Sequence, residues 1–250
     1  MQLVKRIIIA LALATAVFAQ SPELPLSDTR LTVHTLVRED IFAGFLNDDM
    51  ERLTRGEKNA QRLAEAPRSP MEKPPALAWQ AGAVLYRAVA AFENKKPEEF
   101  QKHFDRSQAL FAQAKQLNAK DGGAAAVTGG SYVVFADRLP KDQQAAAWQA
   151  SYEAFSMLWQ FQGKGVERLP IHIRGELLGG LAVSAQRTGR ATEAAEHVER
   201  ILQVMPDTPY GKVARQWKDN PASAKTVTIT CLNCHESGRL TARVAALKAE

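Results

Sequence analysis

The chain has few cysteines and lacks most of the motifs that reveal a catalytic site in a sequence. Only two of its 250 residues are cysteine, and both lie within one short stretch near the C-terminus. No second C-x-x-C and no H-x3-H is present, so a zinc site would need a further ligand from a distant histidine. A nucleophile elbow, a phosphate loop and an H-E-x-x-H pattern are also missing. Gly122-Gly123 and Gly129-Gly130 follow no predicted strand, so they indicate turns or tight helix packing rather than a nucleotide site.

Charge of one sign and long apolar runs are equally scarce. The formal net charge of +5 falls to +3 without Lys5 and Arg6, and no basic block suggests a nucleic-acid partner. After the first 19 residues no long apolar segment follows, so we expect a soluble product without a membrane anchor.

The N-terminus has the pattern of an export signal. Lys5 and Arg6 precede the apolar run from Ile7 to Phe18, which is too short to span a bilayer. Ala19 offers a small residue at the cleavage point. Residues 1–19 are therefore predicted to be a signal peptide, and the mature protein is expected in a bacterial periplasm or outside the cell.

The stretch Cys231-Leu232-Asn233-Cys234-His235 spells C-x-x-C-H. Each thiol can add to one vinyl group of a porphyrin, and the adjacent histidine can then coordinate the iron. The pattern resembles the haem attachment motif of c-type cytochromes. That resemblance implies one covalent haem c held by Cys231 and Cys234, with His235 as an iron ligand. A Cys231–Cys234 disulfide, a redox pair and another metal remain alternatives.

Between these ends the sequence predicts an all-α body. Apolar residues recur at three- and four-residue steps over residues 30–218, and proline and glycine fall mainly at breaks. The one β-like run is residues 226–230. We expect helix pairs at 30–47 with 49–65, at about 79–94 with 97–118, at 122–138 with 141–162, and at 175–207, followed by a capping helix at 209–218.

The pair at 175–207 resembles a tetratricopeptide repeat. A glycine turn at Gly189-Arg190 joins its two helices, and Pro206 ends the second one. The residues that match the repeat's large and small positions are Leu178, Leu181, Ala182, Ala185, Ala194, Val198 and Ile201. The resemblance implies a solenoid of helix pairs over residues 30–218, with a concave face that binds a peptide or protein. A compact α-domain that holds the haem is the alternative.

Two stretches interrupt this body. Pro67, Pro70, Pro74 and Pro75 suggest a flexible or extended link between the first and second pairs. Residues 220–224 suggest another link, which separates the repeats from a haem-binding segment at 219–250. Within that segment residues 240–247 have a helical pattern, with Leu240, Val244 and Leu247 on one stripe.

The sixth iron ligand is not evident from the sequence. Only 15 residues follow His235, and none of them is Met or His. The ligand must therefore come from upstream, from a partner chain or from solvent. The upstream candidates are His34, Met50, His103, Met157, His172, His197 and Met205. A haem iron held by Met opposite His has a high redox potential, and one held by two His ligands has a lower potential. An iron with a vacant sixth site can bind a gas or peroxide.

These observations favour an exported electron carrier that docks to a redox partner protein or enzyme complex. The haem would perform the chemistry, and the protein would tune potential and access. The alternative function is a periplasmic interaction scaffold with a disulfide or redox switch at Cys231 and Cys234. An enzyme such as a haem peroxidase would need polar groups around a vacant iron face, and the sequence identifies no such constellation.

Overall fold

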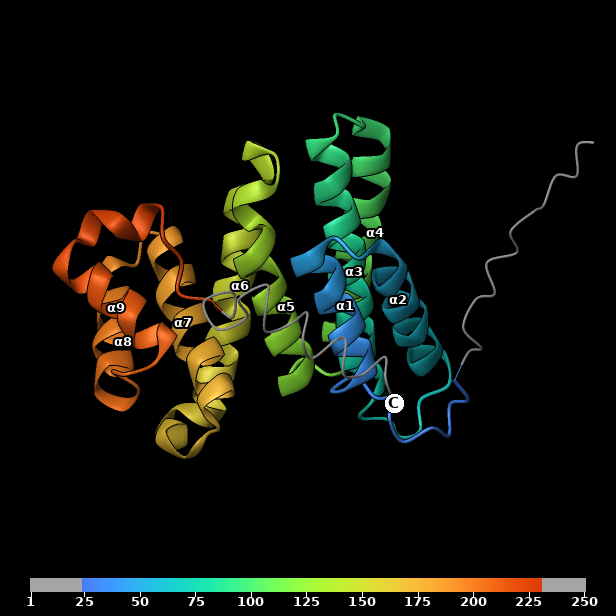
Figure 1. Cartoon of the computed structure of the whole chain (residues 1–250), viewed down its shortest axis with the longest axis horizontal. Coiled ribbons are helices and arrows are strands. Elements are labelled where there is room, and N and C mark those ends of the chain that lie inside the picture. The colour runs from blue at the N-terminus through green and yellow to red at the C-terminus, as the bar shows by residue number, and fades with distance from the viewer. Residues whose placement is uncertain (1–23, 231–250) are drawn as a thin grey trace, which may run out of the picture.

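The computed structural model describes residues 24–230 and shows a row of α-helices joined by short turns (Figure 1). The predicted signal peptide, the C-x-x-C-H motif and the stripe at 240–247 lie outside the described residues. Within residues 24–230 there is no strand, which confirms the all-helical prediction for this part of the chain. The helices are α1 (Leu36–Asn47), α2 (Met50–Glu65), α3 (Lys73–Glu93), α4 (Pro97–Leu117), α5 (Gly122–Phe135), α6 (Lys141–Gln162), α7 (Ile171–Arg187), α8 (Ala191–Val204) and α9 (Pro209–Asp219).

The helices pack as neighbouring pairs. Helix α1 packs on α2, α3 on α4, α5 on α6 and α7 on α8, while α9 covers α8. The first helices of successive pairs also touch one another, since α1 contacts α3, α3 contacts α5, and α5 contacts α7. In Figure 1 the pairs follow one another across the molecule, from α1 and α2 on the right to α7, α8 and α9 on the left. The first helices therefore form one continuous row, and each second helix packs on the first helix of its own pair.

Local chemistry explains most of the helix boundaries. Pro97 occupies the first position of α4, where its missing N–H costs nothing. The Asp121 side chain caps α5 by accepting a bond of 2.8 Å from the amide of Ala124. Gly189 joins α7 to α8 with φ at +80°, a conformation that residues with a Cβ rarely adopt. The predicted turn at Gly189-Arg190 is confirmed.

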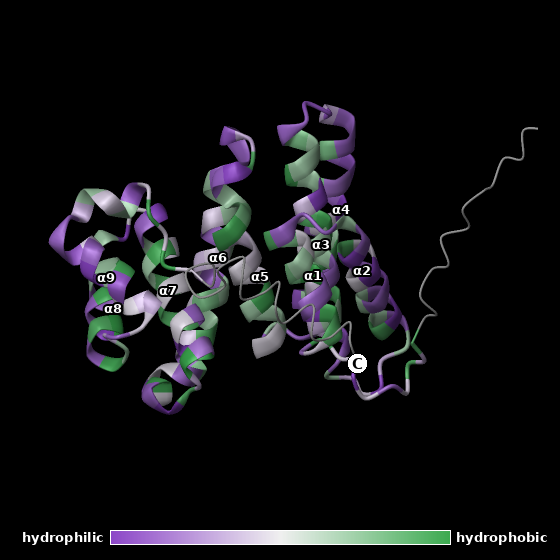
Figure 2. Ribbon diagram, in the orientation of Figure 1, coloured by the Kyte–Doolittle hydropathy of each residue, from purple (hydrophilic) through white to green (hydrophobic). Residues whose placement is uncertain are grey.

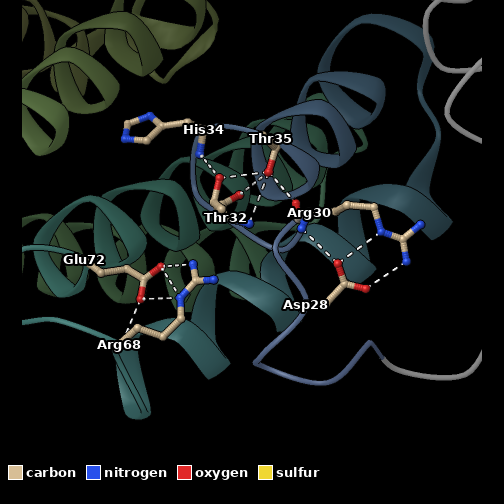
Figure 3. Close-up of polar contacts among 7 residues, drawn as sticks. All are labelled: Asp28, Arg30, Thr32, His34, Thr35, Arg68 and Glu72. Atoms are coloured by element: carbon tan, nitrogen blue, oxygen red, sulfur yellow. Dashed lines mark hydrogen bonds and ion pairs between the residues drawn. The ribbon is translucent and has the colours of Figure 1, made fainter.

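The first helix begins later than its apolar period suggests. Residues 30–35 form turns instead of helix, because the hydroxyls of Thr32 and Thr35 bond each other at 2.8 Å and Thr35 also donates to the carbonyl of Arg30. Figure 3 shows this cluster beside the Asp28–Arg30 and Arg68–Glu72 ion pairs. Threonine hydroxyls that bond to nearby backbone compete with helix formation, which explains the late start.

Two stretches predicted as links are helical in part. Pro67 and Pro70 do lie in the connection between α2 and α3. Pro74 and Pro75 lie in the first turn of α3, where proline is tolerated. Residues 221–225 form the short 3₁₀ helix η3 (Pro221–Lys225), which packs on α9 and α7. The β-like run at 226–230 forms no strand among the described residues, which offer it no partner strand.

The core runs along the first helices, with α3 buried over most of its length. Figure 2 shows the contrast between α2, which is mainly hydrophilic, and the apolar stretches of α3 and α5. Asp40 is the most buried acid there, at 1% exposure. It accepts hydrogen bonds of 2.8 Å from the Nε atoms of Arg52 and Arg55. This ion pair network ties α1 to α2.

Candidate functional site

A pocket of about 300 Å³ lies between α1, α3, α5, α6 and α7, and we call it the central pocket. Its walls are mainly apolar, and its largest side chains are Phe42, Phe45, Trp79, Phe155 and Leu158. They come from three different helix pairs, so only the stacking of the pairs brings them together. A pocket of this size and character is typical of ligand sites in proteins.

One wall of the central pocket is formed by α5 residues without bulky side chains. Gly122, Gly123, Gly130 and Ala126 all line it. A Cβ added at Gly130 would meet no atom within 4 Å, whereas one added at Gly129 would lie 2.7 Å from the Phe155 ring. Gly130 therefore faces open space, and its neighbour faces packed core. Gly123 and Gly129 serve helix packing, as predicted, whereas Gly130 leaves room in the pocket.

The polar groups of the pocket are few. His172 Nε2 lies 3.3 Å from Glu176 Oε1, one helical turn away on α7. Burial raises the pKa of Glu176 to about 7, and the nearby Arg38 acts in the opposite direction. The Glu176 side chain keeps 30% of its surface exposed. Its carboxyl group therefore loses hydration because apolar walls surround it, although it is not fully enclosed. Arg38 is itself bonded to Glu39 at 2.8 Å.

His34 reaches the same pocket from the turn that precedes α1. Its backbone amide donates a bond of 3.1 Å to Thr32 Oγ1, which places the residue within the threonine cluster. Figure 3 shows its imidazole ring pointing away from that cluster. Of the seven candidate iron ligands predicted from the sequence, His34 and His172 are the two that line the central pocket.

The other five candidates lie elsewhere in the described part of the chain. Met205 is 3% exposed in the core, and His197 packs edge-on against the Trp159 ring at 5.3 Å. Burial lowers the pKa of His197 and also that of His103 on α4. A second pocket, between α4, α5 and α6, is lined by Met157. Met50 is the first residue of α2 and lines neither pocket.

The described chain ends against α7. Arg187, at the last turn of α7, donates a bond of 2.9 Å to the carbonyl of Lys225, and the Val227 carbonyl accepts one of 2.9 Å from Trp217. Further on, a Cβ at Gly179 would lie 2.7 Å from the carbonyl oxygen of Ile229. The segment thus runs back along α7 toward its N-terminal end, as Figure 1 shows for the red chain that returns from α9.

Gly179, Glu176 and His172 share one stripe of α7, because they are spaced by three and four residues. Gly179, against which Ile229 packs, therefore lies about 10 Å along the α7 axis from His172, a separation of seven helical residues. The sequence could not reveal this site, because its walls come from helices that are up to about 140 residues apart. Arg38, Trp79 and Glu176 carried no motif that would have identified them.

Comparison of the chain with models of protein families, with curated proteins and with solved structures found no match in any of the three. Among the described helices, none combines the length and the apolar character needed to cross a membrane. Residues 24–230 also contain no group of three or more His, Cys, Asp or Glu side chains placed to hold a metal ion.

Proposed function

We propose that this protein is an exported c-type cytochrome that carries one covalent haem and transfers electrons. The observation that carries the proposal is the C-x-x-C-H sequence of residues 231–235, which directly follows a described segment packed on α7. Cys231 follows Thr230 directly, and the chain before it is packed on α7 beside the central pocket. Five extended residues span at most about 17 Å, so the whole motif is within reach of the pocket.

The two cysteines attach the cofactor. Each S–H would add across one vinyl C=C of the porphyrin, so that a C–S bond would form, the π bond would break, and the hydrogen would go to the other vinyl carbon. No electron is gained or lost in that addition. His235 would supply a nitrogen ligand to the iron. When bound, haem supplies a one-electron exchange between the ferric and ferrous states.

The residues of the central pocket fit such a group. Phe42, Trp79, Phe155 and Leu158 offer apolar walls for a flat macrocycle, and the open space in front of Gly130 provides room. Arg38 lies at the same pocket and can pair with a carboxylate. Walls of this kind exclude water from the iron and tune its potential.

The helical body is proposed to be a tetratricopeptide-like solenoid that docks a redox partner protein or enzyme complex. The order of contacts supports this, because the first helices of successive pairs touch one another and each pair closes on its own second helix. The glycine turn at Gly189 and the end of α8 before Pro206 agree with the repeat pattern in α7 and α8.

The proposal is tested on mature protein exported together with haem maturation machinery. We expect a red protein that keeps its pigment after denaturation and acid extraction, because thioether bonds survive both. A Cys231→Ser, Cys234→Ser double variant should lose the pigment under the same extraction. Colourless wild-type protein would reject the proposal, and a disulfide between the two cysteines would then favour an interaction scaffold.

A further inference from the structure

We propose that one edge of the helical array is a docking surface for a membrane, where it binds the headgroup region of a bilayer rich in anionic lipids. The edge is formed where second helices lead into the next pair, by residues 66–72, 117–121 and 161–173, and we call it the link edge. Figure 1 shows these links along the lower side of the array. The inference goes beyond electron transfer and depends on residues 24–230 alone.

Most of the exposed large apolar side chains of residues 24–230 lie at the link edge. Only Met50 and Phe92 lie at the opposite edge, at the start of α2 and near the end of α3. Single exposed apolar residues are normal on a protein surface, but their concentration at one edge indicates an apolar partner. The exposed apolar residues of the link edge are Met71 at 77%, Leu117 at 50%, Phe161 at 58%, Ile171 at 56% and Ile173 at 43%.

The link between α6 and α7 combines apolar and basic side chains. It contains the short 3₁₀ helix η2 (Gly163–Arg168), which the exposed Phe161 precedes and the exposed Ile171 follows. Lys164 and Arg168 are exposed within η2 itself. At a membrane surface, apolar side chains enter the boundary between headgroups and acyl chains, and nearby cations pair with anionic headgroups. This link therefore has both kinds of contact within 13 residues.

The link edge also presents cations that have no acidic partner. Its own carboxylates are engaged, in the pairs Glu72–Arg68 and Glu167–Arg200 and in the cap that Asp121 provides for α5. Within the part of the chain that the structure describes, no carboxylate forms an ion pair with the exposed cations Lys120, Lys164 and Arg168. Their charge is complementary to the phosphate groups of anionic lipids.

A bilayer matches the arrangement of these side chains better than a protein surface does. The apolar residues and the cations are distributed over three separate links on one side of the array, rather than gathered in one continuous patch (Figure 1). A stable protein interface needs a continuous and closely packed patch. A bilayer accepts separate apolar side chains and cations wherever they reach it, so no spanning helix is required.

The test measures co-sedimentation of the full mature chain with vesicles of phosphatidylethanolamine and phosphatidylglycerol, and with vesicles of phosphatidylcholine alone. We expect binding to the anionic vesicles, roughly tenfold weaker binding to the neutral ones, and release from the anionic vesicles in high salt. A Lys164→Gln, Arg168→Gln variant should bind the anionic vesicles roughly 25-fold more weakly, because each cation near the surface contributes about fivefold. A Phe161→Ser, Ile171→Ser variant should bind them about tenfold more weakly, because less apolar area is buried.

Matched controls carry the same kinds of change at the opposite edge. A Met50→Ser, Phe92→Ser variant and a Lys95→Gln, Lys141→Gln variant should both bind the anionic vesicles within about twofold of wild type, since screening limits the effect of distant charges. All of the substituted side chains are exposed, so every variant should keep the helical circular dichroism of wild type.

Absence of binding to the anionic vesicles, equal binding to the neutral ones, or equal losses in the control variants would overturn the proposal. So would a wild-type dimer in sedimentation equilibrium that binds no vesicles and that the Phe161→Ser, Ile171→Ser variant converts to a monomer, because the link edge would then be an interface between two copies. Vesicle binding by a protein without haem would support the docking surface, while the missing haem would overturn the proposed function.

Discussion

The adjacent glycines of α5 give a direct test of the central pocket. Gly129 and Gly130 have the same helical environment, but an added Cβ at Gly129 would lie 2.7 Å from the Phe155 ring and one at Gly130 would meet nothing within 4 Å. Replacing glycine by alanine inside a helix stabilises it by about 0.5–1 kcal/mol. Overpacking a core by one methyl group costs about 1–3 kcal/mol.

Gly130→Ala should therefore raise the free energy of unfolding by about 0.5–1 kcal/mol, since only the helix propensity changes. Gly129→Ala should lower it by up to about 2 kcal/mol, because the clash with Phe155 exceeds the gain in propensity. The measurement is urea unfolding of both variants and wild type, followed by circular dichroism. Equal free energies for the two variants, or a clear loss of stability in Gly130→Ala, would show that no open pocket faces Gly130.

Three further predictions concern the ion pairs of the body, the pH dependence and the returning segment. Asp40→Ala should cost about 3–5 kcal/mol in urea unfolding, because it leaves the buried Arg52 guanidinium without its ion-pair partner, whereas Glu99→Gln in an exposed pair should cost about 0–1 kcal/mol. Similar losses of stability in the two variants would contradict this difference in burial. Glu176 holds its proton longer in the native state, so wild-type stability should fall as pH rises from about 4.5 to about 7. Glu176→Gln should remove that fall and be more stable at pH 8 by up to about 2 kcal/mol; a variant that keeps the wild-type pH profile would refute the raised pKa. Gly179→Ala should displace Ile229 and speed cleavage of residues 220–230 in limited proteolysis, whereas an unchanged cleavage rate would contradict the packing of this segment on α7.

The helices could be predicted from the sequence because each one depends on local signals. The apolar period, Pro97 at the start of α4 and Gly189 between α7 and α8 fix their elements through interactions within a few residues. The helix boundaries that differ from the prediction depend on side-chain chemistry that the spacing of apolar residues does not reflect. The threonine hydroxyls around residue 32 and the prolines in the first turn of α3 are examples.

The pocket could not be predicted, because it exists only where helices distant in sequence meet. His34 and His172 were both recognised as candidate ligands, yet five equally plausible residues stood beside them. Their selection depends on which helix faces line a shared cavity, a property of the stacking of the pairs. The contact between Ile229 and Gly179 had no sequence signal, since a β-like run does not predict packing along a helix.

The intact mass of the mature, exported protein tests the haem assignment most directly. We expect the mass of the chain from Gln20 onward plus one haem, and this gain should persist under denaturing conditions. A mass that equals the polypeptide alone, or one lower by the two hydrogens of a disulfide, would contradict covalent haem attachment at Cys231 and Cys234.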